Sequence, residues 1–178
     1  MQSEIVTAYI GLGSNLGDRA GNLLFAVRGL IEASFAVVKL SAVYETEPVE
    51  IETDLRFLNM VAEIKSEGVT PSQMMARLLR IEYLLGRTDK SLKKPRTIDL
   101  DLLFFGRETT DSPFLTVPHP RAHLRNFVLV PMAEIAPNYV HPIIHKDMKS
   151  LLSETADRSS VVRWDPMNAH PRPHALNG

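Results

Sequence analysis

The chain has 178 residues, 44% of them hydrophobic, so it is long enough to bury one sizeable core. Its 20 basic and 21 acidic residues leave a formal charge of −1, which argues against a protein that binds nucleic acid or a membrane surface through bulk charge. Because the chain contains no cysteine, disulfides and thiolate metal sites are excluded.

The N-terminus reads Met1-Gln2-Ser3-Glu4 and lacks the basic region and apolar core of a secretory signal. No apolar run approaches the roughly 20 residues that a membrane helix needs. We therefore expect a soluble, cytoplasmic protein. No linker divides the body, so we expect a single domain over residues 1–164 and a flexible tail over residues 165–178.

The first expected element is a strand over residues 5–10, followed by a glycine loop over residues 11–18 and a helix with apolar residues at helical spacing. The glycines are spaced one residue too widely for a dinucleotide-binding fingerprint, and no Gly-Lys-Ser/Thr sequence follows for a P-loop. We interpret the loop as a tight turn, with Asp18 as the helix cap.

Two β-rich runs, residues 36–44 and 57–65, flank a polar break and are expected to pair as a hairpin with a long connection. Thr70 followed by Pro71 predicts the start of a helix that ends near residue 86. A further apolar helix is expected over residues 127–135.

The stretch from residue 95 to 106 predicts a strand with a charged first half and an apolar second half. Alternate strand residues point to one face, so Asp99 and Asp101 should lie side by side, roughly 7 Å apart, while Leu100 faces the other way. Two carboxylates this close repel each other, and a divalent cation with oxygen ligands is the usual remedy. The alternative is an acidic patch at the solvated end of a strand.

A basic segment precedes this strand. Five positive charges stand in ten residues against one acid, Asp89: Arg87, Lys90, Lys93, Lys94 and Arg96. A solvated charge run is one interpretation. Directly before two carboxylates, however, the segment also matches polyphosphate transfer, in which acids hold metal ions and cations neutralise the outer oxygens. We expect a mobile basic loop, with residues 87–94 closing over a substrate.

His119 stands between two prolines, which hold the backbone extended and would aim its ring reproducibly. A structural role is the alternative. His123 lies four residues later, but no third ligand is evident and the prolines interrupt a helix, so we do not expect zinc.

Six sequence blocks carry a resemblance to a known family. In chain order they are Gly11-Leu12-Gly13-Ser14-Asn15, Tyr44-Glu45-Thr46-Glu47-Pro48, Phe57-Leu58-Asn59, Arg80-Ile81-Glu82 with Gly86-Arg87, Pro95-Arg96-Thr97-Ile98-Asp99-Leu100-Asp101 and Val117-Pro118-His119-Pro120-Arg121. From about residue 7 to 142 the chain resembles the 6-hydroxymethyl-7,8-dihydropterin pyrophosphokinases of folate biosynthesis. The resemblance implies an α+β, ferredoxin-like antiparallel sheet with helices packed on it. It also implies ATP as donor, two magnesium ions, and transfer of the β,γ-pyrophosphoryl group to the pterin's hydroxymethyl oxygen with AMP leaving.

The resemblance also implies roles for single residues. Asp99 and Asp101 would hold the magnesium ions, and Arg96 would contact the ATP phosphates as part of the catalytic group. Further nucleotide contacts fall at Arg87, Thr116, His119 and Arg125, and we add Lys93, which departs from the family pattern, to the expected nucleotide-binding residues. The pterin pocket falls at Thr46, Val49, Phe57, Asn59 and Phe127, with the two phenyl rings sandwiching the flat heterocycle.

Four positions depart from the family pattern. An arginine expected at position 89 is Asp89, and a tryptophan expected in the loop is replaced by Lys93, with Lys94 following. The proline expected at position 47 is Glu47, and Phe57 stands where some members have tyrosine. We expect Lys93 or Lys94 to supply the missing charge when the loop closes.

Two other functions compete with this one. A catalytically weakened homologue that binds pterin or nucleotide is suggested by Asp89 and Lys93. An RNA-binding ferredoxin-like module would need exposed aromatic residues on the sheet and no acidic pair at its mouth. The expected partners are therefore small-molecule substrates, without nucleic acid or membrane, and we expect a monomer.

Overall fold

The computed structural model describes residues 4–49, 53–87 and 96–167. Its main sheet is antiparallel throughout, and the strands in chain order are β1 (Ile5–Ser14), β2 (Ala36–Leu40), β3 (Tyr44–Thr46), β4 (Phe57–Glu67), β5 (Asp99–Phe105) and β8 (Val161–Arg163). They lie side by side in the order β5-β1-β4-β3-β8, and β2 also pairs with β4. With one helix after β1 and one after β4, this is the predicted ferredoxin-like arrangement.

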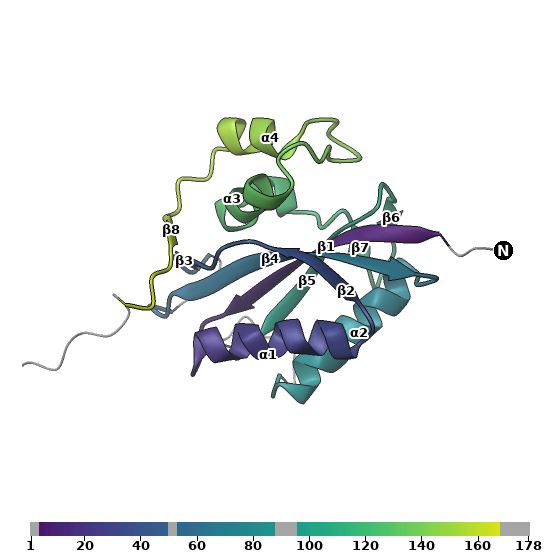
Figure 1. Ribbon diagram of the computed structural model, residues 1–178. Coiled ribbons are helices and arrows are strands. Elements are labelled where there is room, and N and C mark those ends of the chain that lie inside the picture. Colours follow the sequence, from purple (N-terminus) through teal and green to yellow (C-terminus); the bar gives the residue numbers. More distant parts are fainter. Residues whose placement is uncertain (1–3, 50–52, 88–95, 168–178) are drawn as a thin grey trace, which may run out of the picture.

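Helices cover both faces of the sheet (Figure 1). One face carries α1 (Arg19–Glu32) and α2 (Pro71–Leu84), and the other carries α3 (Asn126–Ile135) and α4 (Met148–Glu154). The remaining short elements are β6 (Thr110–Asp111), β7 (Thr116–Val117) and a 3₁₀ turn, η1 (Ala122–Leu124). The sequence predicted three of the four α-helices found in the described residues, and it missed α4 because seven residues are too short for a clear helical period.

The helix starts follow from local chemistry, as predicted. The Asp18 side chain accepts the Gly21 N–H at the start of α1. At the start of α2, Thr70 and Gln73 form a reciprocal capping box, and Pro71 occupies the first turn. Gly86 follows α2 with a φ of +91°, a left-handed conformation that glycine adopts without strain and that ends the helix.

The interpretation of residues 11–14 as a turn is wrong, because β1 continues through them to Ser14. Gly11 pairs with Val61 on one side and Asp101 on the other, and Gly13 pairs with Asn59 and Asp99. A strand flanked on both sides satisfies its backbone groups in two ladders. These ladders outweigh the low strand propensity of glycine.

The predicted hairpin partner of β4 is confirmed, but it forms two strands rather than one. Between β2 and β3 the backbone N–H of Ser41 donates to the Val61 carbonyl, while the Ser41 hydroxyl accepts the Val61 N–H. This side-chain contact replaces a regular ladder bond and separates the two short strands.

The sheet separates two cores. Between the sheet and α1/α2 lie the even-numbered side chains of the β5 start, such as Leu100 and Leu102, as predicted. On the α3/α4 side, the β1–β5 register shifts at Tyr9, so that the successive residues Leu103 and Phe104 both join this second core. The wholly apolar second half of β5 therefore serves both faces.

The C-terminal boundary is only partly described. The backbone N–H of Trp164 donates to the Val43 carbonyl. The indole of Trp164 packs against the first core. Since residues 168–178 lie outside the described residues, the division into a domain and a tail stays a prediction. Among the helices of the described ranges, none combines the length and apolar character required to span a bilayer.

His141, between α3 and α4, makes the stability of this layer dependent on pH. The side chain is 3% exposed, and its Nδ1 accepts the N–H groups of Ile143 and Ile144 at 3.2 and 3.3 Å. Burial, with smaller effects from His123 and His145, lowers the pKa of His141 from 6.5 to about 4. The folded protein therefore resists a proton that the unfolded chain accepts.

We predict that the free energy of unfolding falls as the pH drops from about 6.5 toward 4, because the unfolded chain binds this proton over that range. His141→Asn retains an acceptor for the two amides and removes the titration, so its stability should fall less over the same range. Urea unfolding at pH 7 and pH 5 measures the difference. Equal losses in both proteins would show that His141 is not the cause.

Candidate active site

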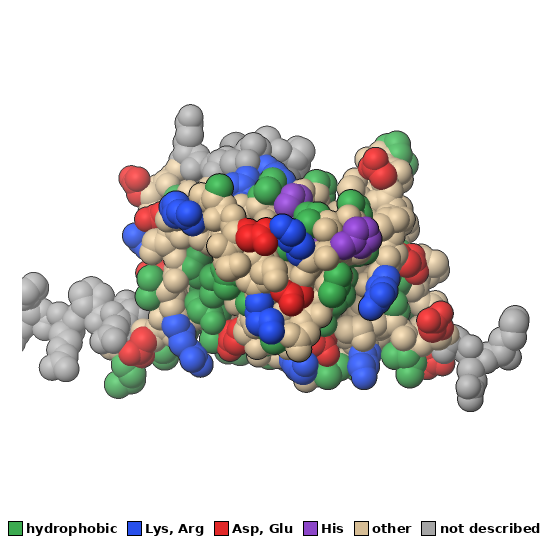
Figure 2. Space-filling view, turned by 90° about the horizontal axis from the view of Figure 1, so that it is seen from above, with side chains coloured by type: hydrophobic (Ala, Val, Ile, Leu, Met, Phe, Trp, Pro, Cys, Tyr) green, Lys and Arg blue, Asp and Glu red, His purple; other side chains and the backbone are tan. Residues whose placement is uncertain are grey.

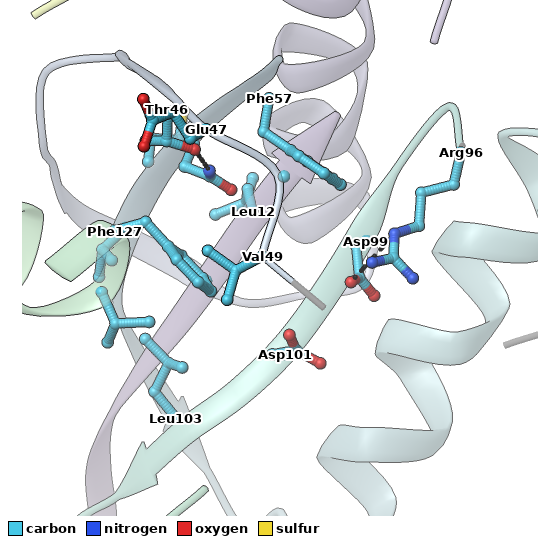
Figure 3. A pocket seen from close by; sticks show the side chains of 16 residues that line it. Leu12, Thr46, Glu47, Val49, Phe57, Arg96, Asp99, Asp101, Leu103 and Phe127 are labelled. Carbon is cyan, nitrogen blue, oxygen red and sulfur yellow. Dashed lines mark hydrogen bonds and ion pairs between the residues drawn. The ribbon is translucent and has the colours of Figure 1, made fainter. Parts of the chain in front are cut away.

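A pocket opens on the α3 side of the sheet, where β1, β4 and β5 lie next to each other (Figure 3). Its empty volume, including the open mouth, is about 580 Å³. Eight residues predicted from sequence line it: Thr46, Val49, Phe57, Asn59, Arg96, Asp99, Asp101 and Phe127. Segments far apart in the chain therefore meet in one place.

The floor of the pocket is a strip of glycine. Gly11 and Gly13 are two residues apart on β1, so both expose bare backbone on the pocket face. A Cβ at Gly13 would lie 2.6 Å from Asn59 Oδ1, whereas a Cβ at Gly11 would lie 3.5 Å from Leu103 Cδ1. Gly13 is thus required for the position of Asn59. Glycine at alternate positions of one strand is the sequence pattern that could have revealed this role. The interpretation of residues 11–18 as a turn missed it.

The walls form a flat slot with one polar edge. The rings of Phe57 and Phe127 stand on either side of the pocket in Figure 3, and Val49 also lines it. At the back, Asn59 Nδ2 donates to Thr46 Oγ1 at 2.7 Å, and both side chains are buried. An aromatic slot with an amide and a hydroxyl at its edge suits a planar heterocycle with hydrogen-bonding groups.

The acidic pair lies at the mouth of this slot. Asp99 and Asp101 project from the same face of β5, opposite Gly13 and Gly11, as their alternation predicted. Arg96 Nε lies 3.4 Å from Asp99 Oδ2, and the Arg96 guanidinium stands 5.6 Å from the centre of the Phe57 ring. The basic and aromatic parts of the site are therefore in contact with one another.

The backbone of Arg96 is held by Asn15, the residue that follows β1. Its N–H donates to Asn15 Oδ1 at 2.7 Å, and its carbonyl accepts the Asn15 N–H at 3.2 Å. Asn15 is buried directly after the end of β1. This two-way contact fixes the backbone at the entrance to β5, and sequence reasoning assigned Asn15 no such role.

The two carboxylates suit a magnesium ion that takes its remaining ligands from water and substrate. They do not suit a metal that is held by protein side chains alone. Within the described ranges, no group of three or more histidine, aspartate or glutamate side chains is placed to hold a metal. Magnesium usually binds through one or two carboxylates and completes its shell with water and substrate phosphates. Asp99 and Asp101 supply the hard oxygen donors for that arrangement.

Arg87 does not belong to a solvated charge run. It is 8% exposed, and its Nη1 contacts Asp99 Oδ1, Glu82 Oε1 at 3.2 Å and the Ile98 carbonyl at 3.3 Å. The left-handed turn at Gly86 directs the chain back beneath the start of β5. Arg87 thus reaches the acidic pair from the α2 side, and its contact with nucleotide stays a prediction.

The other predicted nucleotide contacts lie outside the pocket lining. Thr116 Oγ1 donates to Asp111 at 3.1 Å, and Arg125 is the residue that precedes α3. His119 is held by two hydrogen bonds: its backbone N–H donates to the Leu103 carbonyl, and its Nδ1 accepts the Arg121 N–H at 3.2 Å. Nucleotide binding by Thr116, His119 and Arg125 stays a prediction.

Residues 88–94 of the expected closing loop, which include Asp89, Lys93 and Lys94, lie outside the described residues. The closing loop therefore also stays a prediction.

The alternative of an RNA-binding sheet requires aromatic residues exposed on the sheet. Figure 2 shows the face that carries α3 and α4, where basic and acidic side chains are intermixed. Tyr9 and Phe104, aromatic residues of the sheet, are buried beneath these helices instead of being exposed for base stacking.

Comparison with known proteins gives a consistent result. Residues 9–137, more than half of the chain, match the family described as 7,8-dihydro-6-hydroxymethylpterin-pyrophosphokinase, HPPK. A Bacillus subtilis (strain 168) protein named 2-amino-4-hydroxy-6-hydroxymethyldihydropteridine pyrophosphokinase is 48% identical over 158 residues, covering 88% of this chain and 89% of that protein. A protein of the same name from Aquifex aeolicus (strain VF5) is 36% identical over 150 residues, covering 84% of this chain and 92% of that protein.

Solved structures agree on the fold. The crystal structure of Plasmodium falciparum wild-type HPPK-DHPS with pteroate has a TM-score of 0.69 at 17% identity, covering 86% of this chain and 43% of that chain. At this identity the likeness supports the fold alone. The sequence matches carry the assignment, and the chain belongs to the 7,8-dihydro-6-hydroxymethylpterin-pyrophosphokinase family.

Proposed function

We propose that the slot between Phe57 and Phe127 binds the pterin and that Asp99, Asp101 and Arg96 at its mouth bind the magnesium-loaded phosphates of ATP. As a member of its family, the chain transfers a pyrophosphoryl group to the hydroxymethyl group of hydroxymethyldihydropterin in folate synthesis. The observation that carries the assignment of residues is the arrangement on one sheet face: an aromatic slot and an acidic pair separated only by the glycine strip.

The pterin side of the reaction rests on shape and hydrogen bonding. Stacking between two rings fixes the plane of a heterocycle, and the buried edge formed by Thr46 and Asn59 sets its rotation within that plane. A ring oriented in this way can direct a substituent along β1 toward Asp101. The hydroxymethyl group would then approach the phosphate site without a covalent intermediate on the protein.

The phosphate side rests on charge. Bound magnesium, for which we propose two ions held by Asp99 and Asp101, would neutralise the phosphate oxygens and orient them. Arg96 adds a positive charge at the mouth. No histidine lines the described pocket, so alignment and charge neutralisation, rather than a strong side-chain base, are the contributions expected of this chain.

Three further features belong to this proposal. Lys93 and Lys94 would complete the charge when residues 87–94 close over ATP. We also propose that the protein is a monomer and that it is cytoplasmic. The lack of cysteine is compatible with a reducing compartment such as the cytoplasm.

The acidic pair gives the first test of this function. Asp99→Asn and Asp101→Asn should each lower kcat by about 10²–10³-fold, as is typical when one charge-stabilising group is lost. Asp101→Asn should lower stability little, because it relieves repulsion at a strand end, whereas Asp99→Asn also weakens the ion pair with buried Arg87 and should lower stability more. Release of AMP and circular dichroism measure the two effects. The exposed Asp165→Asn is the control, and a full rate in either site variant would contradict the metal assignment.

The aromatic slot gives the second test. Phe127→Ala should weaken binding of the pterin by about 1–3 kcal/mol, through lost stacking and burial, and leave ATP binding unchanged. Phe114, which is 95% exposed, provides the control variant Phe114→Ala. If Phe127 is an ordinary core residue instead, the variant will lose thermal stability and bind both ligands more weakly to the same extent.

The glycine strip gives the third test, with its own matched control. Gly13→Ala forces Asn59 to move, because the new Cβ would lie 2.6 Å from Asn59 Oδ1. Loss of that buried hydrogen-bonding edge should weaken pterin binding by about 1–3 kcal/mol. Gly11→Ala meets Leu103 at an ordinary 3.5 Å and should have the smaller effect. Calorimetric titration with the pterin decides, and equal effects would show that Asn59 does not read the ligand.

A further inference from the structure

Glu82 lies on α2, outside the pocket lining, and yet its partners belong to the mouth of the site. The side chain is 2% exposed. Its Oε1 accepts the Leu100 N–H at 2.6 Å and contacts Arg87 Nη1 at 3.2 Å. A carboxylate buried to this degree is unfavourable unless it is paired, so a buried charge at this position calls for an explanation beyond packing.

The first contact fixes the backbone between the two acids. β5 lies at the end of the strand order, with β1 on one side and α2 against it. An edge strand has backbone N–H groups that no neighbouring strand accepts. Glu82 accepts the one at Leu100, which stands between Asp99 and Asp101 in the chain. The spacing of the acidic pair is thus tied to α2.

The second contact concerns charge. Arg87 Nη1 contacts both Glu82 Oε1 and Asp99 Oδ1, and both ion pairs are largely buried. One guanidinium is therefore shared by two carboxylates, and the three side chains together carry a charge of −1. Arg96, whose Nε lies 3.4 Å from Asp99 Oδ2, adds a further positive charge, so that without Glu82 the group would be net positive and would attract a divalent cation less strongly.

We propose that Glu82 is a positioning residue that keeps Asp99 available to magnesium by compensating the charge of Arg87 from the α2 side. The inference rests on the proposed function, in which Asp99 binds the metal. When Asp99 turns toward a cation, Arg87 would lose a carboxylate partner in a buried place, which is costly. Glu82 remains paired with Arg87 and lowers that cost. It also competes with Asp99 for the guanidinium in the absence of metal.

A purely structural role makes a different prediction. If Glu82 only caps the β5 edge, Glu82→Gln should be neutral, because the amide oxygen can accept the same Leu100 N–H. If its charge matters, Glu82→Gln should strengthen the hold of Arg87 on Asp99 and so weaken metal binding. The two roles are therefore separable by a substitution that removes the charge and keeps the shape.

The test measures how much magnesium improves nucleotide binding. A non-hydrolysable ATP analogue is titrated calorimetrically with magnesium and with EDTA, and the ratio of the two dissociation constants reports the metal's contribution. In Glu82→Gln this ratio should fall by about tenfold, as is common when a group behind a metal ligand is lost. The affinity measured in EDTA should not fall. In an Arg87→Gln background, Glu82→Gln should have no further effect, since it acts through Arg87.

The matched control is Glu63→Gln. Glu63 is also a buried glutamate, pairs with Lys39 at 3.4 Å and lies outside the pocket lining, so its variant should keep the wild-type ratio. If Glu82→Gln does not fold, Glu82→Asp keeps the charge and should keep the ratio even where the melting temperature falls.

A wild-type ratio in Glu82→Gln, an equal fall in the Arg87→Gln background, or a ratio that follows stability in Glu82→Asp would overturn the inference. An unchanged ratio in Asp99→Asn would instead overturn the metal assignment of the proposed function, and this inference with it.

Discussion

The antiparallel pairing of β1 with β4 on one side and β5 on the other decides where every part of the site lies. This register sets Gly13 between Asn59 and Asp99, and Gly11 between Val61 and Asp101. Since side chains alternate along a strand, all of these positions face α3. A slip of one residue would turn the acids into the α1/α2 core and the leucines into the pocket. The apolar packing of Leu100 and Leu102 therefore also holds the acidic pair in place.

The site combines two physical demands that conflict. A planar ligand needs a dry, apolar slot, whereas phosphates and a cation need fixed charges in a place that water reaches. The structure separates them along the strands: Phe57, Phe127 and Asn59 form the closed end, and Asp99 and Asp101 stand at the mouth. The charge of Asp99 is compensated by Arg87, which also pairs with Glu82, and by Arg96.

Local patterns in the sequence were sufficient for much of this. Caps at Asp18 and Thr70 marked the helix starts, and alternation along β5 placed both acids on one face. The resemblance to a family supplied the five positions, predicted to bind pterin, that meet in the pocket. The predictions that were wrong concerned residues whose environment depends on contacts between distant segments. A strand rich in glycine reads as a turn until its two neighbours are known, and Arg87 reads as an exposed charge until Glu82 and Asp99 are seen around it.

We expect this sheet face to perform pyrophosphoryl transfer and not merely to bind pterin or nucleotide. Phosphorus NMR of a mixture of the protein, ATP, magnesium and 6-hydroxymethyl-7,8-dihydropterin follows every phosphate at once. The account predicts that AMP and a pterin diphosphate appear in equal amounts as ATP disappears. Formation of ADP with a pterin monophosphate, or binding of both ligands without any AMP, would contradict it.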